Sequence, residues 1–467
     1  MMQYKGYLAR VEFDAEANIF YGEVINTRDV ITFQGESAVQ LKKAFEDSIE
    51  DYLSFCAERG EEPNKPLSAT IFIGAGPSKA FTMCPYPLLN EMLDKMLSFA
   101  RNLPDEIENK EMLEYYLPKQ KLFLTYAIMR AIDEPCEQLE IGDIDNREID
   151  SRFENTVNII KQKKYSLDKI FKLLAEKEAG DYKSATKAHW ALTHAISFFM
   201  LQMFSLKHSQ SKFDRAHINL NSLIEELLIQ GLNVNIIDFN YDCLLERIRV
   251  EYGGSSKATF GWDIGRPRKV LADDLAVETM SELVKMGKFR EPWDGERFPR
   301  KANLIKPHGD MCTFLLGKSG VYYRGGLRHS QSTSALFPKK LADISETDDF
   351  LRASIMPPTN SRRRHSSVFY DEELLRFKSA LMNSSIFIII GWSAKGSDEY
   401  YNEIFNEALQ TDNREVKIFI IDKMDTRERV KELFGSKCQI KSFQTDGFTG
   451  ESVLKLKEVL RREITTS

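Results

Sequence analysis

Residues 69–76 read Ala-Thr-Ile-Phe-Ile-Gly-Ala-Gly, and this stretch decides the fold. Its first five residues are apolar or β-branched, which is typical of a strand buried on both faces of a parallel sheet. The strand leads directly into Gly74-Ala75-Gly76, where missing side chains let backbone N–H groups approach a pyrophosphate at a helix N-terminus. Because tight turns use the same residues, this glycine loop on its own is a weak indication of a nucleotide site.

Later parts of the chain repeat the pattern of an apolar run that ends in polar or glycine residues. The carboxyl ends of parallel strands meet at one edge of a sheet, and open α/β sheets bind their ligands there. A segment with the spacing of amphipathic helices, about residues 86–230, separates the glycine loop from the next run. We therefore expect an α/β fold with a Rossmann-like, mostly parallel sheet and a large helical insertion. The later runs span residues 234–242, 304–310, 385–393 and 416–422.

Each polar residue at these strand ends also has an ordinary structural explanation. Asn240 fits a turn in which an asparagine bonds its own backbone, and His308 fits a buried core position. Asp398 fits the cap of a helix that begins near residue 399, and Asp422 fits an unremarkable strand end. Four such coincidences in one order are harder to explain than one, so a shared site is the better interpretation.

The composition is that of a folded protein, with 42 % hydrophobic and 29 % charged residues among 467. No apolar run reaches the roughly 18–20 residues that span a bilayer, and the first residues lack the apolar segment of a signal peptide. We therefore expect a cytoplasmic protein with no membrane contact. The six cysteines lie far apart and form no Cys-x-x-Cys pair, so we expect neither a disulfide framework nor a metal site.

Residues 1–66 have the pattern of a separate unit. They contain 7 Lys and Arg and 13 Asp and Glu, so they carry the whole net charge of −6, while the rest of the chain has 57 of each. Alternation predicts strands at 7–13, 19–25 and 30–33, and Ser37 is the expected N-cap of a helix that ends near Gly60. Such an acidic surface fits either a basic partner or plain solvation.

This unit contains four short motifs, which are Tyr4-Lys5-Gly6-Tyr7, Phe20-x-Gly22-Glu23-Val24, Arg28-Asp29-Val30-Ile31-Thr32-Phe33 and Asp51-Tyr52-Leu53…Cys56…Gly60-x-x-Pro63. Together they resemble the HicB antitoxin family. The resemblance implies a small α+β domain that dimerises and, in the antitoxins, covers a small ribonuclease toxin. The sequence departs from that family after Pro66, where a DNA-binding tail would follow, so no direct nucleic-acid contact is expected and residues 1–66 are interpreted as an accessory or oligomerisation domain.

The remaining chain, residues 67–467, contains four motifs in a fixed order, which are Gly74-Ala75-Gly76-x-Ser78, Asn240-Tyr241-Asp242, His308-Gly309 and Gly391-x-Ser393…Asp398. Their order resembles that of the sirtuin-like domains. The paired zinc-binding cysteines of protein-deacylating sirtuins are absent, and the helical insertion separates the first two motifs. Both departures resemble the bacterial sirtuin-like effectors of antiphage defence, which the resemblance associates with NAD hydrolysis.

The resemblance implies that NAD is the substrate and is cleaved between nicotinamide and ribose. Asn240 would orient water or the nicotinamide ribose, and His308 would be the general base, since histidine titrates near neutral pH. Asp242 shares a face with Asn240 if the segment is still extended there. Asp422 would accept a hydrogen bond from a ribose hydroxyl, by analogy with dinucleotide folds. The expected binding residues are Gly74, Ala75, Gly76, Ser78, Asp242, Gly391, Ser393, Asp398 and Asp422.

Three other interpretations of the sequence remain open. The chain could be a non-catalytic module that senses NAD or ADP-ribose, although a pure binder needs neither Asn240 nor His308. It could be a protein deacylase, which the missing cysteines disfavour, or an antitoxin with a large scaffold. For the NAD hydrolase, control is a physical requirement, because unregulated NAD cleavage would kill the host. Control could come through assembly, a partner protein or the N-terminal unit. We expect a homo-oligomer, and an activating partner could be a phage protein or the ATPase or nuclease of a defence system.

Overall fold

The computed structural model describes most of the chain. The described residues are 2–5, 7–14, 17–24, 27, 29–61, 63, 68–74, 89–103, 110–141, 144–177, 180–205, 210–230, 232–242, 245, 261–263, 269–271, 289–290, 301–311, 313–316, 321–324, 351–356, 368–392, 401–409, 416–422, 425–435, 438–444 and 448–465.

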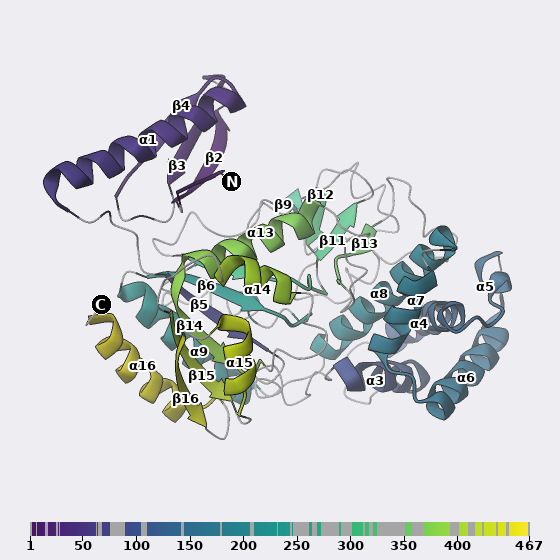
Figure 1. Cartoon of the computed structure of the whole chain (residues 1–467). Coiled ribbons are helices and arrows are strands. Elements are labelled where there is room, and N and C mark those ends of the chain that lie inside the picture. Colours follow the sequence, from purple (N-terminus) through teal and green to yellow (C-terminus); the bar gives the residue numbers. More distant parts are fainter. Residues whose placement is uncertain are drawn as a thin grey trace.

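The first 61 residues form their own sheet, helix and core (Figure 1). The helix is α1 (Ala38–Arg59), and it packs on one face of the antiparallel sheet through buried side chains such as Phe33 and Phe45. The predicted strands and helix are present, with the third strand at Thr32–Gly35 and not at 30–33, and a short first strand precedes them. The strands, in sheet order, are β1 (Met2–Tyr4), β2 (Tyr7–Asp14), β3 (Ile19–Val24) and β4 (Thr32–Gly35).

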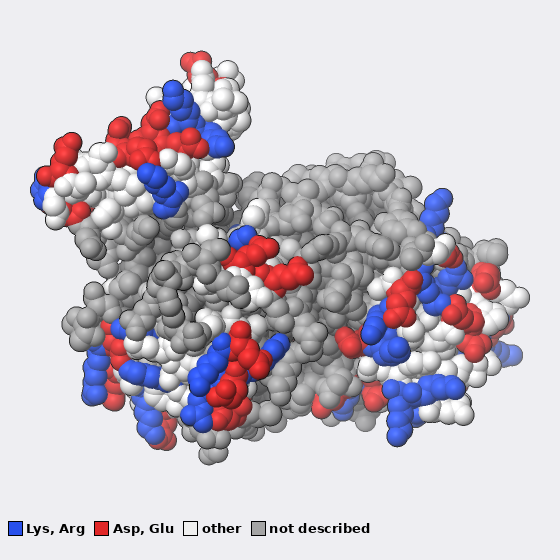
Figure 2. Space-filling model, viewed as in Figure 1, with Lys and Arg blue, Asp and Glu red and all other residues white. Residues whose placement is uncertain are grey.

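Both predicted ends of α1 are confirmed. The Ser37 hydroxyl accepts a hydrogen bond from the backbone N–H of Gln40 at 3.3 Å, which is the N-cap arrangement. Gly60 has a φ of 66° and closes the helix in the left-handed conformation that glycine adopts without strain. Figure 2 shows acidic side chains, with a few basic ones between them, over this unit, as its net charge requires.

The central element of the rest of the chain is a parallel sheet, which has seven strands within the described residues. Its middle strand is β5, the predicted strand before the glycine loop. The next strand along the chain, β6, pairs on one side of β5, and the much later β14 pairs on the other. The sheet order is β16 (Cys438–Gln444), β15 (Val416–Asp422), β14 (Ser384–Ile390), β5 (Ser68–Ile73), β6 (Asn233–Asp238), β10 (Lys301–Ile305) and β7 (Gly261–Asp263).

Helices cover both faces of this sheet. Helices α9 (Gln210–Ile229) and α16 (Gly450–Thr465) pack on one face through leucine-rich surfaces. The opposite face is covered by α13 (Val368–Asn383), α14 (Tyr401–Leu409) and α15 (Arg427–Phe434). This three-layer arrangement confirms the expected α/β class with a Rossmann-like parallel sheet.

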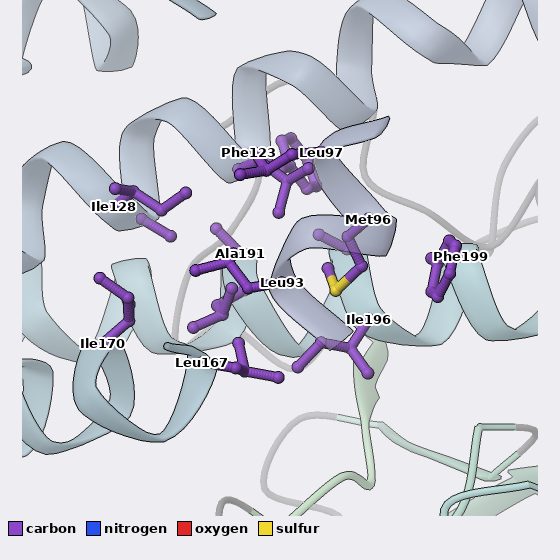
Figure 3. Close-up of a cluster of buried hydrophobic side chains, with 14 of the residues drawn as sticks. Leu93, Met96, Leu97, Phe123, Ile128, Leu167, Ile170, Ala191, Ile196 and Phe199 are labelled. Carbon is purple, nitrogen blue, oxygen red and sulfur yellow. The ribbon is translucent and has the colours of Figure 1, made fainter. Parts of the chain in front are cut away.

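The predicted helical segment divides into two parts. Its last helix, α9, belongs to the sheet layers, whereas the earlier helices pack on one another beside the sheet (Figure 1). Figure 3 shows the core of this helical unit, with Leu93, Phe123, Leu167 and Ile196 from four helices pointing toward one another. The helices are α3 (Leu89–Arg101), α4 (Lys110–Ala131), α5 (Glu137–Ile141), α6 (Asn146–Lys163), α7 (Leu167–Lys177) and α8 (Tyr182–Ser205).

A second small sheet was not predicted. It joins short strands of two to four residues, which carry too little periodicity to be recognised in a sequence. The order is β13 (Leu351–Ala353), β11 (Thr313–Leu316), β12 (Val321–Arg324), β8 (Lys269–Leu271) and β9 (Phe289–Arg290). Among the helices that the structure describes, none is long and apolar enough to cross a bilayer.

Candidate functional site

The carboxyl ends of β5 and β14 lie side by side at the switch point of the sheet, because the strand that follows β5 in the chain, β6, pairs on one side and the strand that follows β14, β15, pairs on the other. The N–H of Gly74 donates to the carbonyl of Ile390 at 3.1 Å, and the N–H of Gly391 donates to the carbonyl of Ile421 at 3.1 Å. A β-carbon on Gly74 would lie 2.2 Å from the Gly391 carbonyl oxygen. Only glycine at position 74 permits this close approach, and ligands of open α/β sheets bind at such switch points.

The side chain of Asn240 is held at this switch point by both hydrogens of its amide. Its Nδ2 donates to the Gly74 carbonyl at 2.9 Å and to Asp238 Oδ1 at 2.9 Å, and its backbone N–H donates to the same Asp238 oxygen at 3.0 Å. A carbonyl and a carboxylate only accept, so the nitrogen of the amide must face them. Oδ1 is then the remaining side-chain atom, an acceptor with no hydrogen bond to any described residue.

His308 lies beside Asn240, because the imidazole of His308 is hydrogen-bonded to Phe239, the residue before Asn240. The His308 Nδ1 is 2.9 Å from the carbonyl oxygen of Phe239, which can only accept, so Nδ1 carries the proton. In the neutral imidazole the lone pair of a base is therefore on Nε2. The ring is only 4 % exposed and lies 5.5 Å from the rings of Phe239 and Tyr401 and 5.9 Å from that of Tyr241.

The segment after His308 is held between the sheet and the helical unit. Gly309 has a φ of 68°, and a β-carbon there would lie 1.5 Å from the Ser354 carbonyl oxygen. The carbonyl of His308 accepts from the N–H of Met356 at 2.8 Å. Farther along the segment, the carbonyl of Met311 accepts from the Ser197 hydroxyl of α8 at 2.7 Å. The backbone from His308 to Met311 is therefore held in place by residues 354–356 and by helix α8 of the helical unit.

A buried ion pair beneath these residues was missed by the sequence analysis. Lys306 Nζ lies 3.0 Å from Asp238 Oδ2, and the two side chains are 3 % and 1 % exposed. Lys306 Nζ also donates to the backbone carbonyl of Asp242. The backbone N–H of Lys306 donates to Glu373 Oε2 at 2.7 Å. The sequence contained a signal for this pair, since Asp238 ends one apolar strand and Lys306 directly follows another. A charged side chain at such a position is buried only when it has a partner.

Aromatic rings pack beneath this edge of the sheet. Trp392, directly after Gly391, has its ring centroid 4.9 Å from those of both Phe72 and Phe239, with interplanar angles of 10° and 5°. The three rings come from three neighbouring strands or the turns that follow them. This stack gives the glycine turn and the Asn240 turn a common rigid support.

The structure brings Gly74, Asn240, His308 and Gly391 together and places two further expected residues nearby. Asp422 ends β15, directly after the Ile421 carbonyl that accepts from Gly391. Asp242 is buried, but β6 ends at Asp238 and residues 241–242 form a bend, so the condition that the segment stay extended is not met. The contact of Asp242 with Lys306 is made by its backbone. The other expected residues, Ala75, Gly76, Ser78, Ser393 and Asp398, lie outside the described residues.

Comparisons with known proteins leave the chain without an assigned family. No protein-family model matches its sequence. A search of curated proteins finds no significant match either. A functional assignment therefore rests on the residues of this site.

Proposed function

We propose that the chain is a sirtuin-like NAD glycohydrolase, which cleaves the nicotinamide–ribose bond of NAD to give nicotinamide and ADP-ribose. The observation that carries the proposal is that hydrogen bonds hold both Asn240 and His308 at the carboxyl end of β6. The Asn240 amide is bound to the glycine turn, and His308 is bound to the adjacent Phe239 carbonyl. In this arrangement Asn240 provides one fixed acceptor, Oδ1, and His308 provides one basic nitrogen, Nε2.

The two glycine turns suit the two halves of a dinucleotide. Gly74, which begins the loop Gly74-Ala75-Gly76 with Ser78, would bring backbone N–H groups to the pyrophosphate. Gly391 and Ser393 would contact the adenosine half, with Asp422 beside them at the next strand end. The nicotinamide riboside would then extend from the pyrophosphate toward Asn240 and His308.

Cleavage of the nicotinamide–ribose bond requires no covalent intermediate with the protein. The C1′–N1 bond breaks with its electron pair passing to the nicotinamide nitrogen, and the ribose becomes oxocarbenium-like. Water attacks C1′ through its oxygen and gives up a proton, which His308 Nε2 accepts. Asn240 Oδ1 accepts a hydrogen bond from that water or from a ribose hydroxyl and so fixes its direction. The products are nicotinamide, ADP-ribose and one proton.

The biological setting proposed is NAD depletion in antiphage defence, in the manner of abortive infection. This part rests on the resemblance to bacterial sirtuin-like effectors and on the separate N-terminal unit, which would serve assembly or docking of an activating protein. A test is phage challenge of cells that carry either the wild-type gene or its His308→Ala variant. The proposal expects a fall in cellular NAD in the first cells alone.

The activity itself is tested with purified protein and NAD in water enriched in oxygen-18. Hydrolysis predicts equal amounts of nicotinamide and ADP-ribose, with one heavy oxygen on C1′ as seen by mass spectrometry. A cyclic product without heavy oxygen would replace hydrolysis by cyclisation. NAD that is bound but never cleaved, with the same affinity in Asn240→Ala and His308→Ala, would support a sensor instead.

A further inference from the structure

Lys306 and Asp238 form an ion pair that is almost fully removed from solvent. Their side chains are 3 % and 1 % exposed, and their charged atoms are 3.0 Å apart. A pair buried this deeply costs much desolvation and often adds no stability over apolar residues of the same size. Its presence at the strand ends that carry Asn240 and His308 therefore calls for a reason besides stability.

The two oxygens of Asp238 have different partners. Oδ2 faces Lys306, whereas Oδ1 accepts from both the backbone N–H and the side-chain Nδ2 of Asn240. The lysine, which lies two residues before His308, also donates to the carbonyl of Asp242 on the far side of Asn240. The ion pair therefore joins the His308 segment to both sides of the Asn240 turn.

We propose that Lys306 and Asp238 are positioning residues that hold the amide of Asn240 with its oxygen toward the substrate. The inference rests on the proposed NAD hydrolysis. Without Asp238 Oδ1, one hydrogen of the Asn240 Nδ2 has no acceptor, and rotation of the amide would present a donor where the water or ribose hydroxyl needs an acceptor. Without Lys306, Asp238 is a buried carboxylate whose Oδ2 has lost the ammonium group that faces it.

The test compares two double variants that both remove the two charges. In Lys306→Met/Asp238→Asn the side chain at 238 still has an oxygen that accepts from Asn240, whereas in Lys306→Met/Asp238→Leu it has none. Single variants remove one charge of the pair while the opposite charge stays buried, and they are expected to fold poorly, but the doubles avoid that cost. Melting temperature, kcat and KM are measured for the doubles and the wild type.

We expect both doubles to fold and the Lys306→Met/Asp238→Leu variant to lose about 100-fold in kcat, with a much smaller change in KM. The Lys306→Met/Asp238→Asn variant should recover at least part of that loss at a similar melting temperature. Two doubles with wild-type kcat would overturn the proposal and leave the pair a structural contact. A loss of kcat in both doubles that only follows a fall in the folded fraction would overturn it as well.

A matched control is another cross-element ion pair, Glu226 with Arg461, which links α9 to α16 on a face of the sheet. Glu226→Leu/Arg461→Met should change the melting temperature and leave kcat of the folded protein unchanged. Crystal structures of the two Lys306 doubles give a readout that needs no activity. A rotated Asn240 amide in the Asp238→Leu variant supports the positioning role even if NAD proves not to be the substrate, and an unmoved amide refutes it.

Discussion

The carbonyl oxygen of Gly391 lies 2.2 Å from the point at which a β-carbon on Gly74 would stand. These two glycines follow β5 and β14, neighbouring strands that are far apart in the sequence. Their contact brings the two turns against each other at the switch point of the sheet, where open α/β sheets bind their ligands. The proposed NAD site therefore depends on this contact.

Gly74→Ala should weaken NAD binding and destabilise the fold. The new methyl meets backbone atoms of Gly391 and Trp392, which cannot turn aside as the tip of a side chain would. Overpacking of this kind costs about 1–3 kcal/mol. Calorimetry of NAD binding and thermal unfolding would measure both effects.

Gly180→Ala is the control for that experiment. A β-carbon on Gly180 would have the Lys177 carbonyl oxygen as its nearest neighbour, at 4.0 Å. We expect its NAD affinity and melting temperature to match the wild type. Equal behaviour of the two alanine variants would contradict the close approach at Gly74.

Gly309→Ala should impair catalysis through the backbone of His308. The residue has a φ of 68°, which alanine adopts only with strain, and its β-carbon would lie 1.5 Å from the Ser354 carbonyl oxygen. The segment 354–356 must then move, and with it the Met356 N–H that binds the His308 carbonyl. The expected outcome is a lower kcat together with a lower melting temperature. A variant with normal kcat would show that this backbone contact does not position the histidine.

Glu226 should make stability depend on pH in the acid range. Hydrogen bonds of 2.7 Å from two nitrogens of Arg461 lower the pKa of Glu226 from 4.5 to about 2. A carboxyl whose pKa is depressed in the folded state stabilises the protein above its unfolded pKa, and the contribution is lost as the pH falls from about 5 toward 2. Because Arg461 is 58 % exposed, we expect Glu226→Gln to cost only about 1 kcal/mol at pH 7. Denaturant unfolding should show a smaller difference in the free energy of unfolding between Glu226→Gln and the wild type at pH 3 than at pH 7. An equal difference at both pH values would contradict the lowered pKa of Glu226.

Ser37→Ala should destabilise the N-terminal unit. The hydroxyl of Ser37 satisfies the N–H of Gln40 at the start of α1, and the loss of such a cap costs about 1 kcal/mol. Hydrogen exchange of peptides from residues 38–59 would report it. Thr426, the N-cap of α15, makes no side-chain cap hydrogen bond, so Thr426→Ala should leave exchange of that helix unchanged.

The main sheet could be predicted where its strands are apolar on both faces. Residues 69–73 and 385–390 are such runs, and both form central strands. Strand β16 was missed because its sequence, Cys-Gln-Ile-Lys-Ser-Phe-Gln, is neither a continuous apolar run nor a regular alternation of polar and apolar residues. The helix boundaries within the predicted helical segment, about residues 86–230, could not be predicted; Lys164, for example, adopts a φ of 52° and ends α6.

The site could be predicted only as a set of strand ends. The apolar runs indicate that Gly74, Asn240 and His308 lie at one edge, but not which strands are neighbours. The Asn240 bond to Gly74 and the bond of His308 to Phe239 depend on that strand order. The ion pair of Lys306 with Asp238 depends on the strand order as well. The sequence therefore shows that each charge stands at the end of an apolar strand, but not that the two residues pair.

The most direct test of the proposed hydrolase is NAD turnover by wild type, Asn240→Ala, His308→Ala and Gly180→Ala protein, followed as nicotinamide release by chromatography. We predict release by the wild type and Gly180→Ala and a loss of about 100-fold or more in the other two, as expected when a general base or an orienting group is removed. Equal release by all four proteins would place the chemistry elsewhere. No release by any of them, with NAD binding that neither Asn240→Ala nor His308→Ala alters, would contradict the hydrolase.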